Sequence, residues 1–138
     1  MVTIKNKDEL CCARTIVTAK AKEEGHTKWD GFKKGRPIQC EQAILLHHEV
    51  GVKGGPCGYP ELQKFAQAPS LPDYQLLVTD ETRSYRVDAF GTPQGKQLVL
   101  LYNQQHYDVV TTLPGFFGTS HFCARCLKPY NNEGQHAC

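Results

Sequence analysis

The sequence predicts an α+β protein, and three observations support this. Apolar residues recur at helical spacing through the first half of the chain. After Pro69 they give way to short runs rich in β-branched and aromatic residues, which are typical of strands. The last twenty residues follow neither pattern and are rich in cysteine and histidine. We therefore expect N-terminal helices packed on a small antiparallel sheet, followed by a short C-terminal extension.

Composition restricts the possible functions. The chain has 138 residues, of which 40% are hydrophobic and 22% charged, as expected for one compact core. A net charge of +2 is too weak to make nucleic-acid binding the favoured function. No apolar run approaches the roughly 18 residues of a membrane span, and the N-terminus does not resemble a signal peptide. We expect a monomeric, intracellular protein, cytoplasmic or nuclear, that does not bind membranes.

Three helices are predicted. The first begins near Cys11, with Asp8 as its N-cap. The second lies within the segment 38–52 and ends at Gly51. The third has Pro60 in its first turn. Their apolar positions are expected to face the core. These positions are Leu10, Ala13, Ile16, Val17, Ile38, Ala43, Leu45, Leu46, Val50, Leu62, Phe65 and Ala66.

The segment 25–37, between the first two helices, is polar, basic and rich in glycine, which indicates a loop or an irregular arm anchored by Trp29 and Phe32. Trp29 is also a candidate contact for a protein substrate. Strands are predicted at residues 74–80, 84–90, 96–103 and 106–113, and the fourth should form a hairpin with the third.

Seven cysteines and no export signal favour reactive or metal-binding thiols over a disulfide framework. Cys123, Cys126, His136 and Cys138 form a C-x2-C-x9-H-x-C pattern that fits one structural zinc ion, and His121 could replace His136. We therefore divide the chain into a domain of residues 1–118 and a zinc knuckle of residues 119–138. Such a knuckle can bind nucleic acid, or it can only stabilise the fold of the chain. The alternative to a zinc site is a free C-terminal tail in which the cysteines have no ligand role.

A nucleophile and a base are predicted far apart in the sequence. Cys11 lies at the first turn of a helix, where backbone N–H groups and the helix dipole favour the thiolate. His106 and Asp108 are two residues apart on a strand and should point to the same side, so that Asp108 orients the imidazole. Nucleophile, base and orienting carboxylate are then all present. Cys12 is the rival nucleophile, but it points about 100° away on the helix.

The remaining cysteines and histidines have structural interpretations. Cys12 is expected in the core or on the flank of its helix, and Cys40 and Cys57 are expected to be buried thiols. His47 and His48, in an apolar stretch of the second helix, are expected to be packed or half-exposed rather than ligands.

The pattern Asp8-x-x-Cys11-x-x-Arg14, followed by His106-Tyr107-Asp108 on a late strand, resembles the ovarian tumour (OTU) cysteine proteases, a deubiquitinase family. The resemblance covers roughly residues 4–112. It implies a papain-like fold and a triad of Cys11, His106 and Asp108. It also implies an oxyanion hole formed by the loop that contains Asp8, Glu9 and Leu10, and ubiquitin or a ubiquitin-like modifier as substrate.

A second resemblance involves three other segments. Residues 6–21, 55–65 and 122–130 with the closing His-Ala-Cys are similar to the N-terminal region of protein-primed family B DNA polymerases of Polinton-type transposons and related viruses. This resemblance implies an OTU-like domain that belongs to a longer viral or mobile-element polymerase. The alternatives are a non-catalytic module of a replication protein that binds nucleic acid or protein, and a protease that processes a polyprotein.

Overall fold

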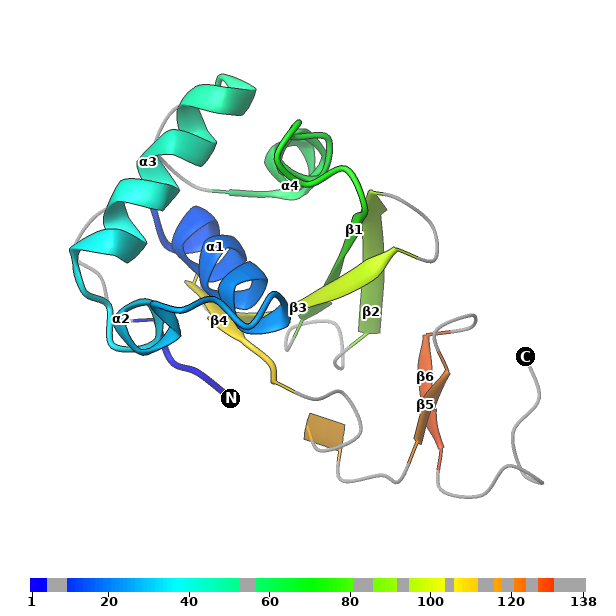
Figure 1. Cartoon of the computed structure of the whole chain (residues 1–138). Helices are drawn as coiled ribbons and strands as arrows, with labels where there is room; N and C mark the ends of the chain where they lie inside the picture. The colour runs from blue at the N-terminus through cyan, green and yellow to red at the C-terminus, as the bar shows by residue number, and fades with distance from the viewer. Residues whose placement is uncertain are drawn as a thin grey trace.

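Helices precede strands along the chain, in the α+β arrangement that the sequence predicts (Figure 1). The computed structural model describes residues 1–4, 10–52, 57–80, 86–91, 95–103, 106–111, 116–117, 121–123 and 127–130. Its elements are α1 (Cys11–Glu23), α2 (Trp29–Lys33), α3 (Pro37–Val50), α4 (Tyr59–Ala66), β1 (Tyr74–Asp80), β2 (Arg86–Gly91), β3 (Lys96–Asn103), β4 (His106–Val109), β5 (His121–Cys123) and β6 (Lys128–Tyr130).

The helix ends mostly follow the local sequence signals. α1 begins at Cys11 as predicted, but its N-cap is Leu10, which makes no side-chain cap hydrogen bond, so the prediction of Asp8 as the N-cap is wrong. Asp8 itself lies outside the described residues. α3 ends at Gly51, whose φ of 70° is the left-handed conformation that closes many helices. α4 carries Pro60 in its first turn, where no intrahelical N–H is needed.

Two predictions in this region are wrong. The segment 25–37 is not a continuous loop, because it contains the short helix α2, although Phe32 is buried and Trp29 packs against the core as its two anchors. Leu45 was expected in the core and is 58% exposed. The polar Gln39 is buried on α3 instead, where it accepts a hydrogen bond from Arg14 and donates one to the carbonyl of Phe32.

The sheet is mixed rather than antiparallel. Its strand order is β2-β1-β3-β4, and β1 pairs parallel with β3, whereas β1–β2 and β3–β4 are antiparallel. The antiparallel prediction fails because β2 folds back on the outer edge of β1. The strand after this hairpin runs in the original direction, and it pairs with β1 on the other side. β4 does form the predicted hairpin with β3, but it ends at Val109 instead of residue 113.

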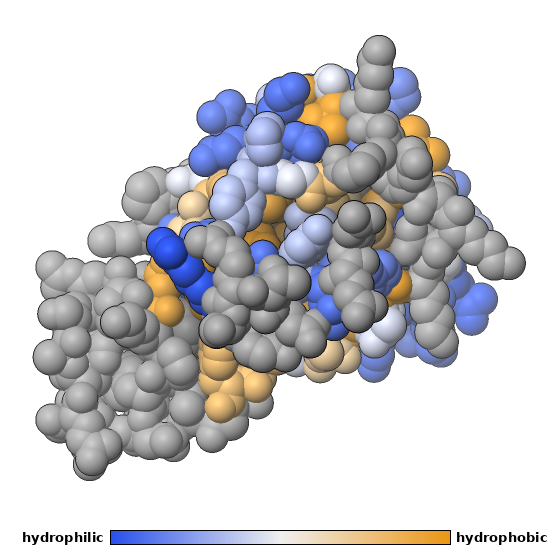
Figure 2. Space-filling model, turned by 180° about the vertical axis from the view of Figure 1, so that it is seen from behind, coloured by the Kyte–Doolittle hydropathy of each residue, from blue (hydrophilic) through white to orange (hydrophobic). Residues whose placement is uncertain are grey.

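The helices cover one face of the sheet, and alternate strand residues separate its two faces (Figure 1). Leu76, Leu98 and Leu100 pack with the helices, whereas Leu77 and Leu101 belong to a second cluster on the opposite face. Phe116, Phe117 and Leu127 pack against that second cluster. Seen from behind, hydrophobic residues reach the surface in separate patches among hydrophilic ones (Figure 2).

The C-terminal segment contains a two-stranded antiparallel pairing of β5 with β6 that the sequence did not predict. Each strand has only three residues, which is too short for an alternating hydrophobic pattern to be recognised. For these strands the structure describes the backbone alone.

Candidate active site

The first turn of α1 lies against β4, so Cys11 is held beside Tyr107. The hydroxyl of Thr15 lies 2.6 Å from the carbonyl oxygen of Cys11 and 3.0 Å from that of Tyr107. The backbone of Tyr107 also acts on the Cys11 thiol, whose pKa it lowers. Two regions that are far apart in the sequence, and that were predicted to supply nucleophile and base, are therefore neighbours in the structure.

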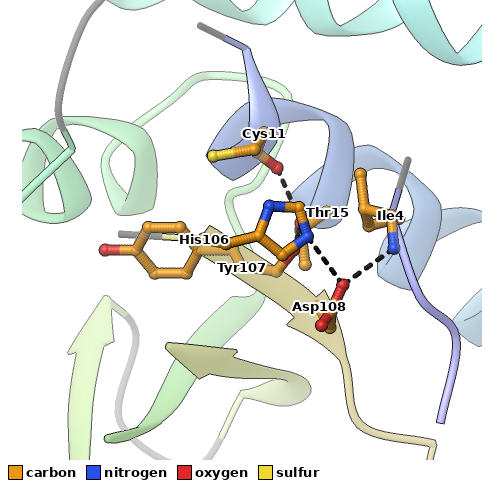
Figure 3. A network of polar contacts seen from close by, with 6 residues as sticks. All are labelled: Ile4, Cys11, Thr15, His106, Tyr107 and Asp108. Carbon is orange, nitrogen blue, oxygen red and sulfur yellow. Dashed lines mark hydrogen bonds and ion pairs between the residues drawn. The ribbon is translucent and has the colours of Figure 1, made fainter. Parts of the chain in front are cut away.

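His106 and Asp108 point to the same side of β4, as strand alternation predicts. Nε2 of His106 lies 3.0 Å from Oδ1 of Asp108. An ionised carboxylate can only accept, so Nε2 carries the proton, and Nδ1 is the basic nitrogen of the neutral ring. In Figure 3 the imidazole lies between the backbone of Cys11 and Asp108, and the sulfur of Cys11 points to one side rather than toward the ring. The ring of His106 and the first turn of α1 are thus neighbours.

The N-terminal segment supplies a residue that the sequence analysis missed. The backbone N–H of Ile4 donates a 2.8 Å hydrogen bond to Oδ1 of Asp108, the same oxygen that His106 contacts (Figure 3). Val2 pairs with Val109 through two backbone hydrogen bonds and so extends the sheet beyond β4. The only sequence signal was the alternation of Val2 and Ile4, both of which are buried.

The pKa of the Cys11 thiol is raised, whereas the sequence predicts a lowered pKa at a helix N-terminus. Partial burial raises the pKa of Cys11 above its ordinary value, and the backbone hydrogen bond from Tyr107 offsets this only in part. The helix N-terminus therefore does not produce a preformed thiolate, because desolvation is the larger effect. A nucleophilic reaction of Cys11 consequently needs a base that removes the proton as the sulfur attacks.

Cys12, the residue after Cys11, interacts with Cys57. Cys12 is only 3% exposed, and burial raises its pKa well above the ordinary value, which agrees with its predicted place in the core. Its side chain is hydrogen-bonded to Cys57, whose carbonyl oxygen accepts a 2.7 Å bond from the Tyr107 hydroxyl. Cys57 and Cys40 are partly exposed, so the prediction that both are buried is wrong.

The side chains of Cys11, His106 and Asp108 differ in their exposure to solvent. The side chain of His106 is 36% exposed and that of Asp108 17%, while Cys11 is partly buried. An incoming molecule can thus reach the base, whereas the carboxylate that orients it is sheltered. A cavity of about 110 Å³ lies beside β4, and its lining residues are Cys57, Gly58, Tyr59, Val78, Asp80, Tyr102 and Tyr107. A groove of about 380 Å³ lined by residues of α1 and α3 contains none of the residues of the predicted triad.

Other predicted residues lie partly outside the described chain. Of the oxyanion loop, Leu10 is described and partly buried, whereas Asp8 and Glu9 are not described. Of the four proposed zinc ligands, only Cys123 has a described backbone, at the end of β5 opposite Lys128; the alternative ligand His121 begins the same strand. The others, Cys126, His136 and Cys138, lie outside the described residues. Within the described ranges no group of three or more histidine, cysteine or acidic side chains could hold a metal ion.

His47 has the structural role that was predicted for it. Its Nδ1 lies 2.8 Å from the carbonyl oxygen of Val52, and its ring packs edge-on against Phe65. The neighbouring His48 is exposed on α3.

Comparison with protein-family models, with curated proteins and with solved structures found no match to this chain. Among the described helices, none combines the length and the apolar character needed to cross a membrane.

Proposed function

We propose that the protein is a cysteine protease of the OTU type, which cleaves the bond after the C-terminal glycine of ubiquitin or a ubiquitin-like modifier. One observation carries the proposal: the ring of His106, held 3.0 Å from Asp108 on β4, lies beside the first turn of α1, which carries Cys11. The same residues occupy the positions at which the sequence resembles the OTU family. The choice of ubiquitin rests on that resemblance.

The proposed reaction is an acyl transfer in two steps. Nδ1 of His106 takes the proton of Cys11 while the sulfur attacks the glycine carbonyl carbon. The carbon–nitrogen bond then breaks, and the imidazolium returns the proton to the departing lysine amine, which leaves a thioester on Cys11. A water molecule deprotonated by His106 hydrolyses the thioester to a carboxylate and restores the thiol.

Base and carboxylate have separate roles in this scheme. Asp108 keeps the proton on Nε2, so that Nδ1 stays available, and it stabilises the imidazolium that forms after proton transfer. The Ile4 N–H holds the carboxylate oxygen in place. Backbone amides around Leu10 are proposed to stabilise the oxyanion, a contribution typically worth about 10²–10³ in rate.

Labelling with ubiquitin that carries a C-terminal electrophile tests the proposal. Wild-type protein and Cys12→Ala should each gain the mass of one ubiquitin, whereas Cys11→Ala and His106→Ala should not, because they lack the nucleophile or its base. Circular dichroism should confirm that each variant is folded.

The absence of an adduct with ubiquitin and with every modifier tested would remove the deubiquitinase proposal. Cleavage of a longer polypeptide downstream of this domain would then favour the processing protease. Salt-dependent DNA binding that is lost in Cys123→Ser would favour the non-catalytic module.

We also propose that the C-terminal segment binds one structural zinc ion. Cys123 ends β5, and in the sequence Cys126 follows it by three positions, before β6 begins at Lys128. Thiolate and imidazole ligands suit zinc, which would supply folding free energy to a segment with little apolar area of its own. His136 and Cys138, or His121 in place of His136, would complete the ligand set.

A further inference from the structure

The cavity beside β4 has no part in the reaction proposed above. Its volume is about 110 Å³, and its walls come from the start of α4 and from residues of β1, β3 and β4. In Figure 3 the phenol of Tyr107, which lines the cavity, extends away from the imidazole of His106. Neighbouring strand residues point to opposite faces of a sheet, so the cavity lies on the helix-covered face.

Three neighbouring strands contribute a row of side chains to this cavity. Asp80 on β1 pairs with Tyr102 on β3, which pairs with Tyr107 on β4, so the three side chains share one face of the sheet. The ring centroids of Tyr102 and Tyr107 are 4.9 Å apart, and the rings are inclined at 50°. Asp80 is only 8% exposed. One side of the cavity therefore consists of two aromatic rings with a buried carboxylate beside them.

Tyr59 adds a third aromatic ring from the first turn of α4. Its hydroxyl donates a 2.6 Å hydrogen bond to Asp88, and the hydroxyl of Tyr107 donates a 2.7 Å bond to the carbonyl of Cys57. The protons of both phenols are thus used within the protein, and these bonds hold the rings in place. Tyr59 and Tyr107 therefore offer a ligand their aromatic surface rather than a hydrogen-bond donor.

The charges around the cavity favour a cation over an anion. Asp80 lines the cavity, and Asp88 is bonded to one of its aromatic walls. The carboxylate of Glu61 accepts the backbone N–H of Gly58 and so offsets the positive end of the α4 dipole. The guanidinium of Arg86 opposes these carboxylates, but it lies 3.7 Å from Asp88 and its side chain is 67% exposed to water. Among the described groups named here, negative charge therefore predominates.

We propose that this cavity binds the methylated ammonium head of an organic cation, either a trimethyllysine side chain or a free quaternary amine. Aromatic faces attract such a cation, and Asp80 supplies the opposite charge. An unmethylated ammonium is more strongly hydrated and loses more on entering apolar surroundings. Because a cavity of about 150 Å³ can hold benzene, one of about 110 Å³ has room for the smaller trimethylammonium group.

Titration with choline, followed by NMR of the tyrosine ring protons, tests the site in the wild-type protein. Choline should shift the signals of Tyr102 and Tyr107. Its neutral isostere 3,3-dimethyl-1-butanol should bind at least ten-fold more weakly, because it has the shape without the charge. Equal affinities would overturn the proposal, since only the shape would then be recognised. Shifts confined to residues outside the cavity, or no shifts at all with choline, would overturn it too.

Variants separate the carboxylate from the rings. Asp80→Asn and Tyr102→Leu should each weaken choline binding at least ten-fold, because they remove the charge or an aromatic face. Tyr102→Phe keeps the ring and should bind within about two-fold of wild type. Tyr74→Phe, at the other end of β1, is the matched control and should bind like wild type. Circular dichroism checks the fold of each variant. Wild-type affinity in folded Asp80→Asn would overturn the role of the carboxylate.

A peptide that contains trimethyllysine distinguishes the two sources of the cation. If the ligand is a polypeptide, the peptide should bind more tightly than choline; if it is a free amine, choline should bind at least as tightly as the peptide. The same peptide with unmodified lysine should bind at least ten-fold more weakly than the methylated one, and equal binding would overturn the preference for methylation. Cys11→Ala should bind choline like wild type, so this site and the protease proposal can fail separately.

Discussion

At the scale of single residues, the arrangement depends on one carboxylate oxygen. Oδ1 of Asp108 accepts hydrogen bonds from the ring of His106 and from the backbone of Ile4. Bonds to an ionised acceptor are stronger than bonds between neutral groups, so this oxygen both anchors the carboxylate and fixes the imidazole. Substitution of Asp108 should therefore lower the reactivity of Cys11, although the nucleophile Cys11 and the base His106 both remain.

We expect Asp108→Ala to slow ubiquitin-probe labelling by about 10²-fold or more, because the base loses its orientation. Asp108→Asn should cost about ten-fold, since the amide oxygen still accepts a hydrogen bond but carries no charge. Pseudo-first-order labelling rates measure both effects. Asp30→Ala, which removes a carboxylate on the exposed side of α2, is the control and should react like wild type. Wild-type labelling by Asp108→Ala would contradict the assigned role.

The buried thiols predict how stability changes with pH. Burial raises the pKa of Cys12 well above its ordinary value, so the thiol stays protonated in the fold while the unfolded chain ionises above about pH 8.5. Stability is therefore fully present below that pH and falls as pH rises, by at most about 1.4 kcal/mol per pH unit for this group. Urea unfolding between pH 7 and pH 10 should show the decrease. Cys12→Ala should show a shallower decrease, and an identical slope in both proteins would contradict it.

At the scale of elements, local patterns identified most helices and strands, but not how the strands pair. Periodicity located α1, α3, α4, β1 and β3 because side-chain spacing depends on neighbouring residues. It missed α2, which has only five residues, and β5 and β6, which have three each. The parallel pairing of β1 with β3 depends on which edge of β1 the hairpin strand β2 occupies. No local pattern contains that information.

Two glycines at element ends should differ in their tolerance of a side chain. Gly91 ends β2 with φ of 97°, and a Cβ there would lie 2.9 Å from the backbone oxygen of Tyr74. Gly51 closes α3 with φ of 70° and has open space around it. Gly91→Ala should therefore lower the free energy of unfolding by more than about 2 kcal/mol, and Gly51→Ala by about 1 kcal/mol. Urea denaturation measures both, and a smaller loss for Gly91→Ala than for Gly51→Ala would contradict the packing.

At the scale of the whole molecule, the predicted triad and the proposed zinc ligands fall in different parts of the chain. Cys11, His106 and Asp108 are held by the packing of α1 on the four-stranded sheet, which has its own buried core. Cys123 lies on the separate β5–β6 hairpin. Metal binding and thiol reactivity should therefore be separable.

We expect the protein to bind one zinc ion per chain, measured by elemental mass spectrometry, and Cys123→Ser to lose it. Ubiquitin-probe labelling of Cys11 should remain within about two-fold of wild type in that variant, because the core around α1 does not depend on the metal. Cys40→Ser is the matched control and should keep its zinc. Equal zinc content in Cys123→Ser and in wild type would contradict the assignment of this ligand.

Local sequence patterns are sufficient to predict the order of helices and strands, the place of Cys11 at a helix start, and the shared side of His106 and Asp108. Each of these follows from residues a few positions apart, through helix and strand geometry. Only the packed fold brings the backbone of Ile4 to a carboxylate 104 positions away and brings Cys57 to Cys12, and only burial in that fold raises the pKa of Cys11. Desolvation and contacts between distant segments exist only once the chain is packed, so no spacing in the sequence encodes them directly.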